Sequence, residues 1–266
     1  MSLRSNLIAL ALCASLVGCA SMRGYEEELN TASVERVYEI CKEALDNGNY
    51  ERAERDLKRL TGRFPFGEIS EQAQLDLAFA QTKSDNSEEA LATVNRFIKT
   101  YPTHKNVDYA FYLRGLINYE RDRNLLDTVV PGDRALHDQR TNKQAFLDFA
   151  ELIKRYPDSK YVPDARQRML ALRALLADSE LRVAQYYLRR GAYVGAINRA
   201  KFVVETYQQT PQAADALAVL VEAYTQLGEQ QLAADTKKVL QLNAPQHASL
   251  TGGSEKGSRW WPFGRN

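Results

Sequence analysis

The chain has 266 residues, of which 35 are Lys or Arg and 34 are Asp or Glu, so its formal net charge is only +1. This balance gives no reason to expect a nucleic acid or a purely electrostatic membrane contact as the partner. The chain contains only 14 glycines and 8 prolines. Its richness in Ala, Leu, Tyr, Glu and Arg favours helix.

The first residues predict a secretory signal. Arg4 supplies the basic start, and the apolar stretch Leu7–Val17 is too short to span a bilayer, since a helix needs about 20 residues. The stretch ends in the letters LVGC, which resemble the lipobox of bacterial lipoproteins, in which the cysteine is acylated and becomes the first residue of the mature protein. We therefore expect residues 1–18 to be a lipoprotein signal peptide and Cys19 to carry covalent lipid.

Two details bear on this prediction. Apolar signals contain cysteine by chance, as Cys13 illustrates, but the basic residue, the apolar stretch and LVGC together favour lipidation. Ala20 follows the cysteine where an aspartate would favour retention at the inner membrane, so resemblance to known sorting rules indicates the outer membrane, with the chain on its periplasmic side. Residues 19–31 are then a lipidated linker.

The remaining cysteine predicts no disulfide. With Cys13 removed and Cys19 acylated, Cys41 is left without a partner even in an oxidising compartment. It occupies a helix position where a small packed residue is needed, which favours a buried, inert thiol over a nucleophile.

Internal repeats dominate the rest of the chain. Three segments share a glycine, a small residue five positions later and apolar residues four and seven positions beyond that. They are Gly48, Ala53, Leu57, Leu60; Gly191, Ala196, Ala200, Val203; and Gly228, Ala233, Lys237, Leu240, with Lys237 the one exception to the pattern. Glycine suits a left-handed turn, alanine allows helices to approach closely, and the prolines at 65 and 245 end the second helix.

Two further units fit with departures. The second places Asp85 and Asn86 at the turn and keeps Ala90, Val94 and Phe97 in register. The third pairs a first helix containing Gly115 with a second containing Ala145, Phe149 and Leu152. An insertion at about residues 121–142 separates these two helices, and we expect it to form a short helix folded back on the repeat, interrupted by Pro131 and Gly132. Residues 164–188 predict one long continuous helix.

These units resemble the tetratricopeptide repeat, a helix pair of about 34 residues. The predicted fold is all-α: an α-solenoid of five tetratricopeptide-like helix pairs with an insertion in the third. Repeats 1–3 occupy residues 32–157, repeats 4 and 5 occupy 158–245, and the Gly- and Ser-containing segment 246–266 predicts a disordered tail.

The residues offer no catalytic site. His104, His137 and His247 fall in a turn, the insertion and the tail, outside metal-ligand spacings, and there is no G-x-S-x-G or P-loop motif. The acidic run 26–28 favours a solvated helix start. We therefore expect no enzyme, no metal and no cofactor apart from the lipid on Cys19.

Solenoids bind proteins through the extended face of their first helices. Repeat phase places the following residues of repeats 1–3 on that face as candidate groove residues: Tyr38, Leu75, Phe79, Tyr109, Tyr112, Leu116 and Tyr119. Together they predict apolar pockets with hydroxyl groups, although each tyrosine alone fits packing between repeats equally well. In repeat four, Arg189, Arg190 and Arg199 are candidate partner-binding residues, with a solvated basic face as the alternative.

Three segments narrow the resemblance: RFPFGEISEQAQLDLAFAQ, YPTHKNVDYAFYLRGLINY and RYPDSKYVPDARQRM. With the lipobox and five repeats, they resemble the BamD family of lipoproteins of the β-barrel assembly machine across nearly the whole mature chain. The resemblance implies a scaffold that holds BamA, contacts accessory Bam lipoproteins and receives unfolded outer-membrane β-barrel proteins in the groove of repeats 1–3, with repeats 4 and 5 as the partner-binding half.

The family pattern assigns no role to the aromatic residues near the end of the chain. Trp260, Trp261 and Phe263 are candidates for a docking element or an interfacial anchor. The alternative functions are a periplasmic repeat lipoprotein that organises peptidoglycan or division enzymes, and an envelope hydrolase, for which no catalytic residue can be named.

Overall fold

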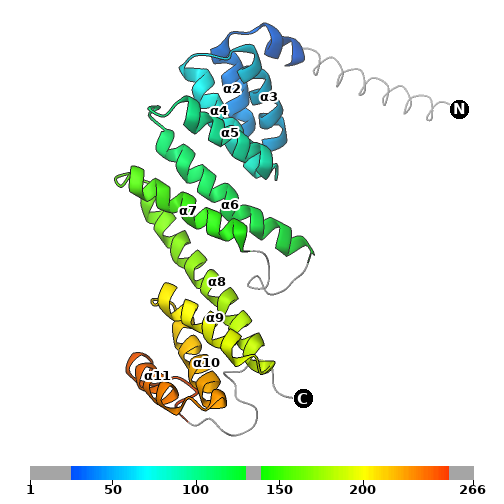
Figure 1. Ribbon diagram of the computed structural model, residues 1–266. Coiled ribbons are helices and arrows are strands. Elements are labelled where there is room, and N and C mark those ends of the chain that lie inside the picture. Colours follow the sequence, from blue (N-terminus) through cyan, green and yellow to red (C-terminus); the bar gives the residue numbers. More distant parts are fainter. Residues whose placement is uncertain (1–24, 130–138, 252–266) are drawn as a thin grey trace, which may run out of the picture. The chain divides into compact units, whose positions relative to one another are not determined.

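The computed structural model describes residues 25–129 and 139–251, without the side chains of 122–129. Within that part the regular elements are helices and no strand occurs (Figure 1). The helices are α2 Val34–Asp46, α3 Tyr50–Arg63, α4 Glu68–Lys83, α5 Ser87–Thr100, α6 Val107–Val129, α7 Arg140–Arg155, α8 Val162–Arg189, α9 Tyr193–Thr206, α10 Gln212–Leu227 and α11 Gln230–Asn243. The all-helical prediction is confirmed.

The chain divides into two compact units, residues 1–121 and 122–266. The sequence analysis instead divided the repeats after residue 157. The structure places α7, the second helix of the third repeat, with the C-terminal unit, because α7 packs on α8. The two units are described separately below as unit 1 and unit 2.

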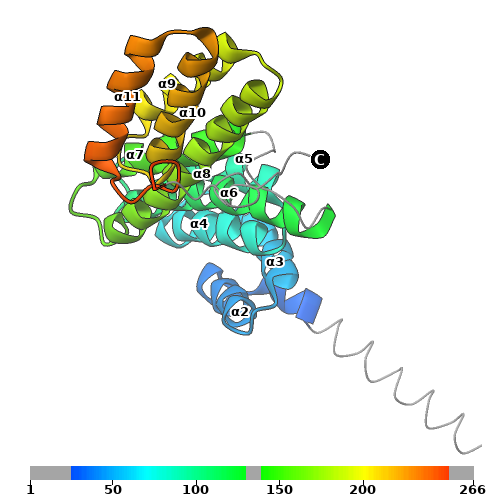
Figure 2. The ribbon, with the colours of Figure 1, turned by 90° about the horizontal axis from the view of Figure 1, so that it is seen from below.

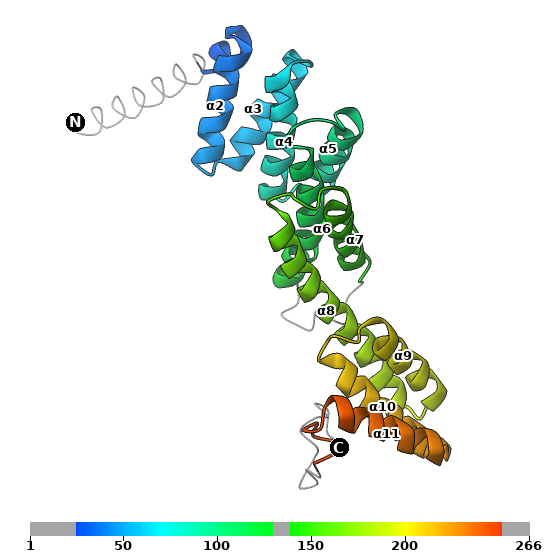
Figure 3. The same ribbon diagram turned by 90° about the vertical axis from the view of Figure 1, so that its left-hand side faces the viewer.

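Unit 1 is built of helix pairs that pack in sequence. α2 packs on α3, α3 on α4 and α4 on α5, and the first helices α2 and α4 also touch (Figure 3). Asn49 begins α3 by accepting a hydrogen bond from the Arg52 backbone N–H at 3.2 Å, which satisfies a donor that the first helical turn leaves free. One buried cluster joins α2, α3 and α4, and a second joins α4, α5 and α6.

The predicted turns share one backbone geometry. The left-handed residue is Gly48, Gly191 or Gly228, with φ between 71° and 79°, and in the second repeat it is Asp85, with φ 63°. In each turn the next residue donates its N–H to the carbonyl five positions earlier, as Asn49 does to Ala44 at 2.9 Å. This bond is the mark of a Schellman helix end, so Asp85 performs the role of glycine, as its place in the repeat predicted.

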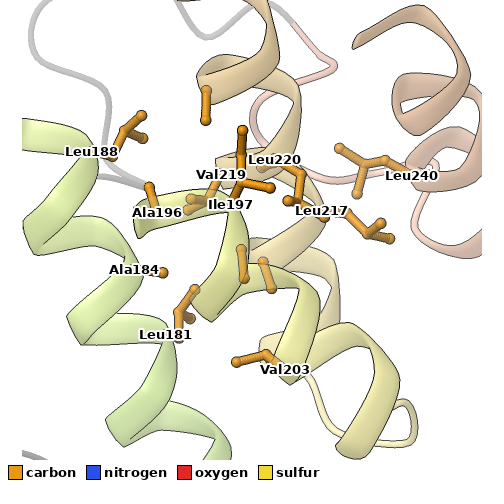
Figure 4. Close-up of a cluster of buried hydrophobic side chains, with 14 of the residues drawn as sticks. Leu181, Ala184, Leu188, Ala196, Ile197, Val203, Leu217, Val219, Leu220 and Leu240 are labelled. Carbon is orange, nitrogen blue, oxygen red and sulfur yellow. The ribbon is translucent and has the colours of Figure 1, made fainter. Parts of the chain in front are cut away.

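Unit 2 packs α7 on α8, α8 on α9, α9 on α10 and α10 on α11, and its first helices α8 and α10 also touch (Figure 2). The predicted long helix is α8, which has 28 residues. Figure 4 shows the core, in which Leu181 of α8, Ala196 and Val203 of α9 and Leu217 of α10 meet in one buried cluster. The small side chain of Ala196 is fully buried there, as the repeat pattern requires.

Residues 25–31, predicted as part of a linker, are instead helical and packed on α3. Leu29 is fully buried in the first cluster, and the Tyr25 ring lies 4.4 Å from the Arg52 guanidinium. Glu26 pairs with Arg59 at 2.6 Å. The sequence around Leu29 did not predict that this side chain is buried, because the residues that pack on it belong to other helices.

Two other predictions, for the insertion and for the tail, need correction. α6 continues to Val129, so the start of the insertion extends the first helix of repeat three and does not form a separate short helix. Residues 130–138 lie outside the described residues. The first residues of the predicted tail, 246–251, form consecutive turns against α10, where His247 meets Asp215 at 3.0 Å and Leu250 packs on the core.

Among the described helices, none combines the length and apolar character that crossing a membrane would require.

Candidate functional site

A chain of hydrogen bonds links the first helices of unit 1. The Tyr38 hydroxyl on α2 donates to Asp76 Oδ2 on α4 at 2.7 Å, and Gln72 donates to the other oxygen of Asp76 at 3.0 Å. Asn106, which immediately precedes α6, donates from its side chain to Gln72 Oε1 at 2.7 Å. All four side chains are half-buried, so these bonds fix the relative positions of the three helices at a partly exposed surface.

Ionisation of Tyr38 is suppressed at this surface. Burial raises the pKa of the Tyr38 hydroxyl well above its ordinary value, and the hydrogen bond to Asp76 raises this pKa further. The hydroxyl is therefore a neutral hydrogen-bond donor at any physiological pH.

Aromatic side chains flank this polar chain. Phe79 lies three residues beyond Asp76 on α4, with its ring edge-on to Tyr50 at 5.9 Å and the Lys83 ammonium 5.9 Å from its centroid. On α6, half-buried side chains recur at helical spacing, at Tyr109, Tyr112, Leu116 and Tyr119. We call the surface formed by the following residues the first-helix face: Tyr38, Gln72, Asp76, Phe79, Asn106, Tyr109, Tyr112, Leu116 and Tyr119.

Leu75 does not belong to this face, and its predicted place in the groove is wrong. Its side chain is 0% exposed and packs in the cluster that α4 shares with α5 and α6. α4 is covered by α3 on one side and by α5 on another, which leaves only a narrow stripe of its surface open. The stripe runs through Gln72, Asp76, Phe79 and Lys83, spaced by four, three and four residues.

The sequence analysis missed Gln72, Asp76 and Asn106. A helical projection centred on Phe79 places Gln72 and Asp76 beside it, so that signal was present in the sequence. Asn106 precedes its helix, and only the fold brings it to Gln72.

The predicted arginines of unit 2 are all exposed. Arg199 on α9 pairs with Glu180 on α8 through a 2.8 Å contact between Nη1 and Oε2. Arg190, at the end of α8, lies with its guanidinium 5.5 Å from the centroid of the Tyr186 ring, and Arg189 precedes it. Both Tyr186 and Val194 are exposed on either side of this turn. Guanidinium groups and exposed apolar side chains therefore occur together here, which is a composition typical of protein interfaces.

Cys41 is buried, as predicted, and burial raises the pKa of its thiol to about 12, so the reactive thiolate is scarce at neutral pH. No three His, Cys, Asp or Glu side chains in the described part of the chain come close enough to hold a metal ion. Cys19, His137, Trp260, Trp261 and Phe263 lie outside the described residues.

Comparison with known proteins gives a consistent result. A family described as outer membrane lipoprotein, YfiO, matches residues 30–240. The outer membrane protein assembly factor BamD of Neisseria meningitidis serogroup A is 38% identical over 265 residues, which cover 98% of this chain and 99% of that protein. The BamD of Vibrio cholerae is 40% identical, covering 90% of this chain and 97% of its own length.

Other similarities are shorter or more distant. The BamD of Xylella fastidiosa strain Temecula1 is 44% identical over 227 residues, covering 85% of this chain and 76% of that protein. A crystal structure of MamA protein shares 17% identity with a TM-score of 0.31, covering 81% of this chain and 92% of that chain, which is too distant to inform the fold. The match over residues 30–240 and the near full-length relatives show that the chain belongs to the BamD family of outer membrane protein assembly factors.

Proposed function

We propose that this protein is a non-enzymatic, lipid-anchored scaffold for the assembly of outer-membrane β-barrels, which binds BamA and unfolded outer-membrane proteins. The observation that carries the proposal is the similarity to BamD proteins over nearly the whole chain. In this scheme Cys19 holds the protein at the periplasmic side of the outer membrane, and accessory Bam lipoproteins are further partners.

Unit 2 supplies the contact to BamA. Arg189, Arg190 and Arg199 are exposed, and guanidinium groups suit paired contacts to carboxylates on a partner. The Arg199 guanidinium is held by Glu180, which limits the side-chain freedom lost on binding.

Unit 1 supplies the contact to unfolded substrates. An extended chain presents free backbone amides and carbonyls, and the first-helix face offers Gln72, Asp76, Asn106 and tyrosine hydroxyls beside aromatic rings. An unfolded ligand loses conformational entropy when it binds, so the affinity is weak and release is fast. Such binding suits a protein that passes its substrate on.

The proposal is tested first at unit 2, by copurification of BamA with the tagged protein from solubilised envelopes. Arg199→Gln is a better variant than Arg199→Glu, because a glutamate would face Glu180 and disturb unit 2 by repulsion. We expect Arg199→Gln to reduce BamA recovery about tenfold, the loss of about 1.4 kcal/mol expected for a charged contact.

Arg36→Gln is the control, since Arg36 is an exposed arginine of unit 1 that pairs with Glu28. If the recovery of BamA is unchanged with Arg199→Gln, then Arg199 is not part of the contact to BamA. Recovery of peptidoglycan or division enzymes without BamA contradicts the whole function.

Unit 1 is tested with a fluorescent peptide that ends in phenylalanine. We expect micromolar binding that Tyr112→Ala weakens about tenfold, from the loss of one buried ring. Phe66→Ala is the matched control, because Phe66 is 86% exposed in the loop between α3 and α4 and lies outside the first-helix face. Equal binding by Tyr112→Ala and the wild type contradicts the assignment of this face.

A further inference from the structure

The last helix of unit 2 leaves an apolar surface open. α11 packs on α10 through Ala233 and Leu240, which are both buried. Three other apolar side chains of α11 are exposed: Leu232 by 46%, Val239 by 43% and Leu242 by 85%. Their spacing of seven and three residues places them on one side of the helix, and we call this surface the α11 face.

This surface lies on the outside of the repeat, because Phe202 and Glu205, which hold the places of Val239 and Leu242 in the preceding repeat, are also exposed. α9, the second helix of the preceding repeat, packs on both α8 and α10, whereas among the described helices α11 packs on α10. The end repeat of a solenoid needs a polar outer surface to remain soluble. Lys237 and Gln241, at the places of Ala200 and Val204 of α9, provide one, whereas Leu232, Val239 and Leu242 form a separate apolar surface on the outside of α11.

The chain itself leads to this surface. After α11 the residues 246–251, which we call the strap, fold back on the start of α10. His247 Nε2 lies 3.0 Å from Asp215 Oδ1 in the first turn of α10, and Leu250 packs on the core. α10 and α11 are consecutive helices joined by a short turn and packed together, so the strap ends beside the last turn of α11, which contains Leu242.

The following sequence has the length and composition of a cover. Residues 252–259 read GGSEKGSR, and they separate the strap from Trp260, Trp261, Pro262 and Phe263. A spacer of this kind spans about 17 Å on average, and the distance along α11 between Leu242 and Leu232 is about 15 Å. The aromatic residues therefore reach the α11 face without any change in unit 2.

The chemistry of the two surfaces is also complementary. Each of the three aromatic side chains can bury about 150–250 Å², and Pro262 prevents them from continuing as a helix. Arg259 precedes the tryptophans. Asp235 is exposed on the α11 face between Leu232 and Val239, and it is ionised because hydrogen bonds from Gln231 and Lys238 lower its pKa.

We propose that the segment 260–263 docks on the α11 face of its own chain and covers these exposed apolar side chains. The tether gives the segment a millimolar effective concentration at this surface, so modest affinity is sufficient. A partner that binds the α11 face must displace the segment first. The proposal is independent of the function proposed above.

Trp260 and Trp261 are the two tryptophans of the chain, so tryptophan fluorescence reports on this segment alone. The probe is the chain from residue 19 onward with Cys19→Ser, which carries neither leader nor lipid and needs no detergent, compared with a free peptide of residues 252–266. We expect the protein to emit at shorter wavelength than the peptide and to be less accessible to acrylamide. Leu242→Asp should return both properties to those of the peptide.

Leu170→Asp is the matched control, since Leu170 is 67% exposed on α8, and it should leave the emission unchanged. Circular dichroism should show that each variant keeps its helices, since both leucines are exposed enough to tolerate aspartate. Peptide-like emission from the wild type overturns the proposal, as does a blue shift that Leu242→Asp does not alter.

Two other occupants give different results. A blue shift that disappears on dilution, together with a dimer in sedimentation, assigns the α11 face to a second copy of the chain and overturns docking within one chain. A blue shift that appears only with vesicles of phosphatidylethanolamine and phosphatidylglycerol assigns the segment to the membrane surface and also overturns it.

Discussion

Apolar clusters join the helices of both units, but the polar contacts that supplement them differ. In unit 1, carboxylates bridge separate helical segments: Asp76 accepts from Tyr38 of α2, and Asp56, which is buried, accepts from Tyr25 of the N-terminal segment. Buried Glu54 of α3 accepts from Asn86 before α5 at 2.8 Å. In unit 2, one continuous apolar cluster extends through α8, α9, α10 and α11.

The difference suits the two units to different tasks, holding a binding surface in a fixed shape and presenting charged groups to a partner. Hydrogen bonds weaken steeply when the distance or angle between their groups changes. The polar bridges of unit 1 therefore fix the spacing of the first helices, which form the candidate substrate surface. An apolar cluster can be packed in several arrangements of similar energy, so it constrains helix spacing less strictly. The charged groups of unit 2, such as Arg189, Arg190 and Arg199, lie outside this cluster and are exposed to a partner.

The largest expected effect is on the free energy of unfolding, and it comes from removing a buried leucine from each unit. Leu60 and Leu240 occupy the same repeat position and are both buried, so each change to alanine should cost about 2–5 kcal/mol of unfolding free energy. We expect the larger loss for Leu60→Ala, because residues 25–31 add packing around its cluster, whereas α11 packs on α10.

The measurement uses Cys41 as a reporter of unit 1. With Cys13→Ser and Cys19→Ser it is the remaining thiol, and its burial and raised pKa prevent reaction with a disulfide reagent until unit 1 opens. Leu60→Ala should accelerate labelling strongly and Leu240→Ala should not. Equal acceleration by both variants would show that the two units unfold as one.

The second prediction compares a bonded and an unbonded tyrosine. Tyr25→Phe removes the hydroxyl that donates to the buried Asp56 and leaves it only the longer contact to Arg52 Nε at 3.5 Å, so it should cost about 1–3 kcal/mol in chemical denaturation. The hydroxyl of Tyr207 makes no hydrogen bond within the described residues, so Tyr207→Phe should change stability by less than about 0.5 kcal/mol. Equal costs would mean that the polar bridge adds nothing to unit 1.

The pH dependence sharpens this comparison. Burial and the bond to Asp56 raise the pKa of Tyr25 from 10.0 to about 12. Between these values the unfolded chain has lost the proton that the folded chain retains, so the stability from this tyrosine falls as pH rises. The difference between the wild type and Tyr25→Phe should therefore shrink above pH 10.0.

The third prediction tests the turns that both units share. Gly48→Ala in unit 1 and Gly228→Ala in unit 2 should each cost about 1 kcal/mol, because both positions have positive φ while a Cβ meets nothing within 4 Å. Gly62 lies inside α3 with equally open space, so Gly62→Ala should stabilise unit 1 by about 0.5–1 kcal/mol. Thermal melts measure all three, and a stabilising Gly48→Ala would contradict the turn geometry.

The smallest effect concerns exposed ion pairs. Arg199→Gln in unit 2 and Arg36→Gln in unit 1 should each lower stability by about 1 kcal/mol or less, because solvent screens both pairs. A much larger loss for Arg199→Gln in a thermal melt would mean that this residue holds α8 and α9 together, and its effect on copurification would then be structural.

The sequence by itself determined the local structure of this protein. The turns follow from residues that tolerate positive φ, and even Asp85 was placed correctly because the repeat register is local. Burial of Ala53, Ala196 and Phe149 likewise follows from the 3.6-residue period. The tyrosines of the first-helix face lie half-buried, and their role in binding stays a prediction.

Tertiary structure alone decided which surfaces are covered by segments outside the local repeat. Leu75 is buried because α5 and α6 lie over it, and Asn106 meets Gln72 across two helices. Residues 25–31 and the strap look irregular in sequence, yet they are held by Asp56 and Asp215, more than 30 positions away in the chain. Periodicity describes one helix at a time, whereas burial depends on neighbours that only the folded chain brings together.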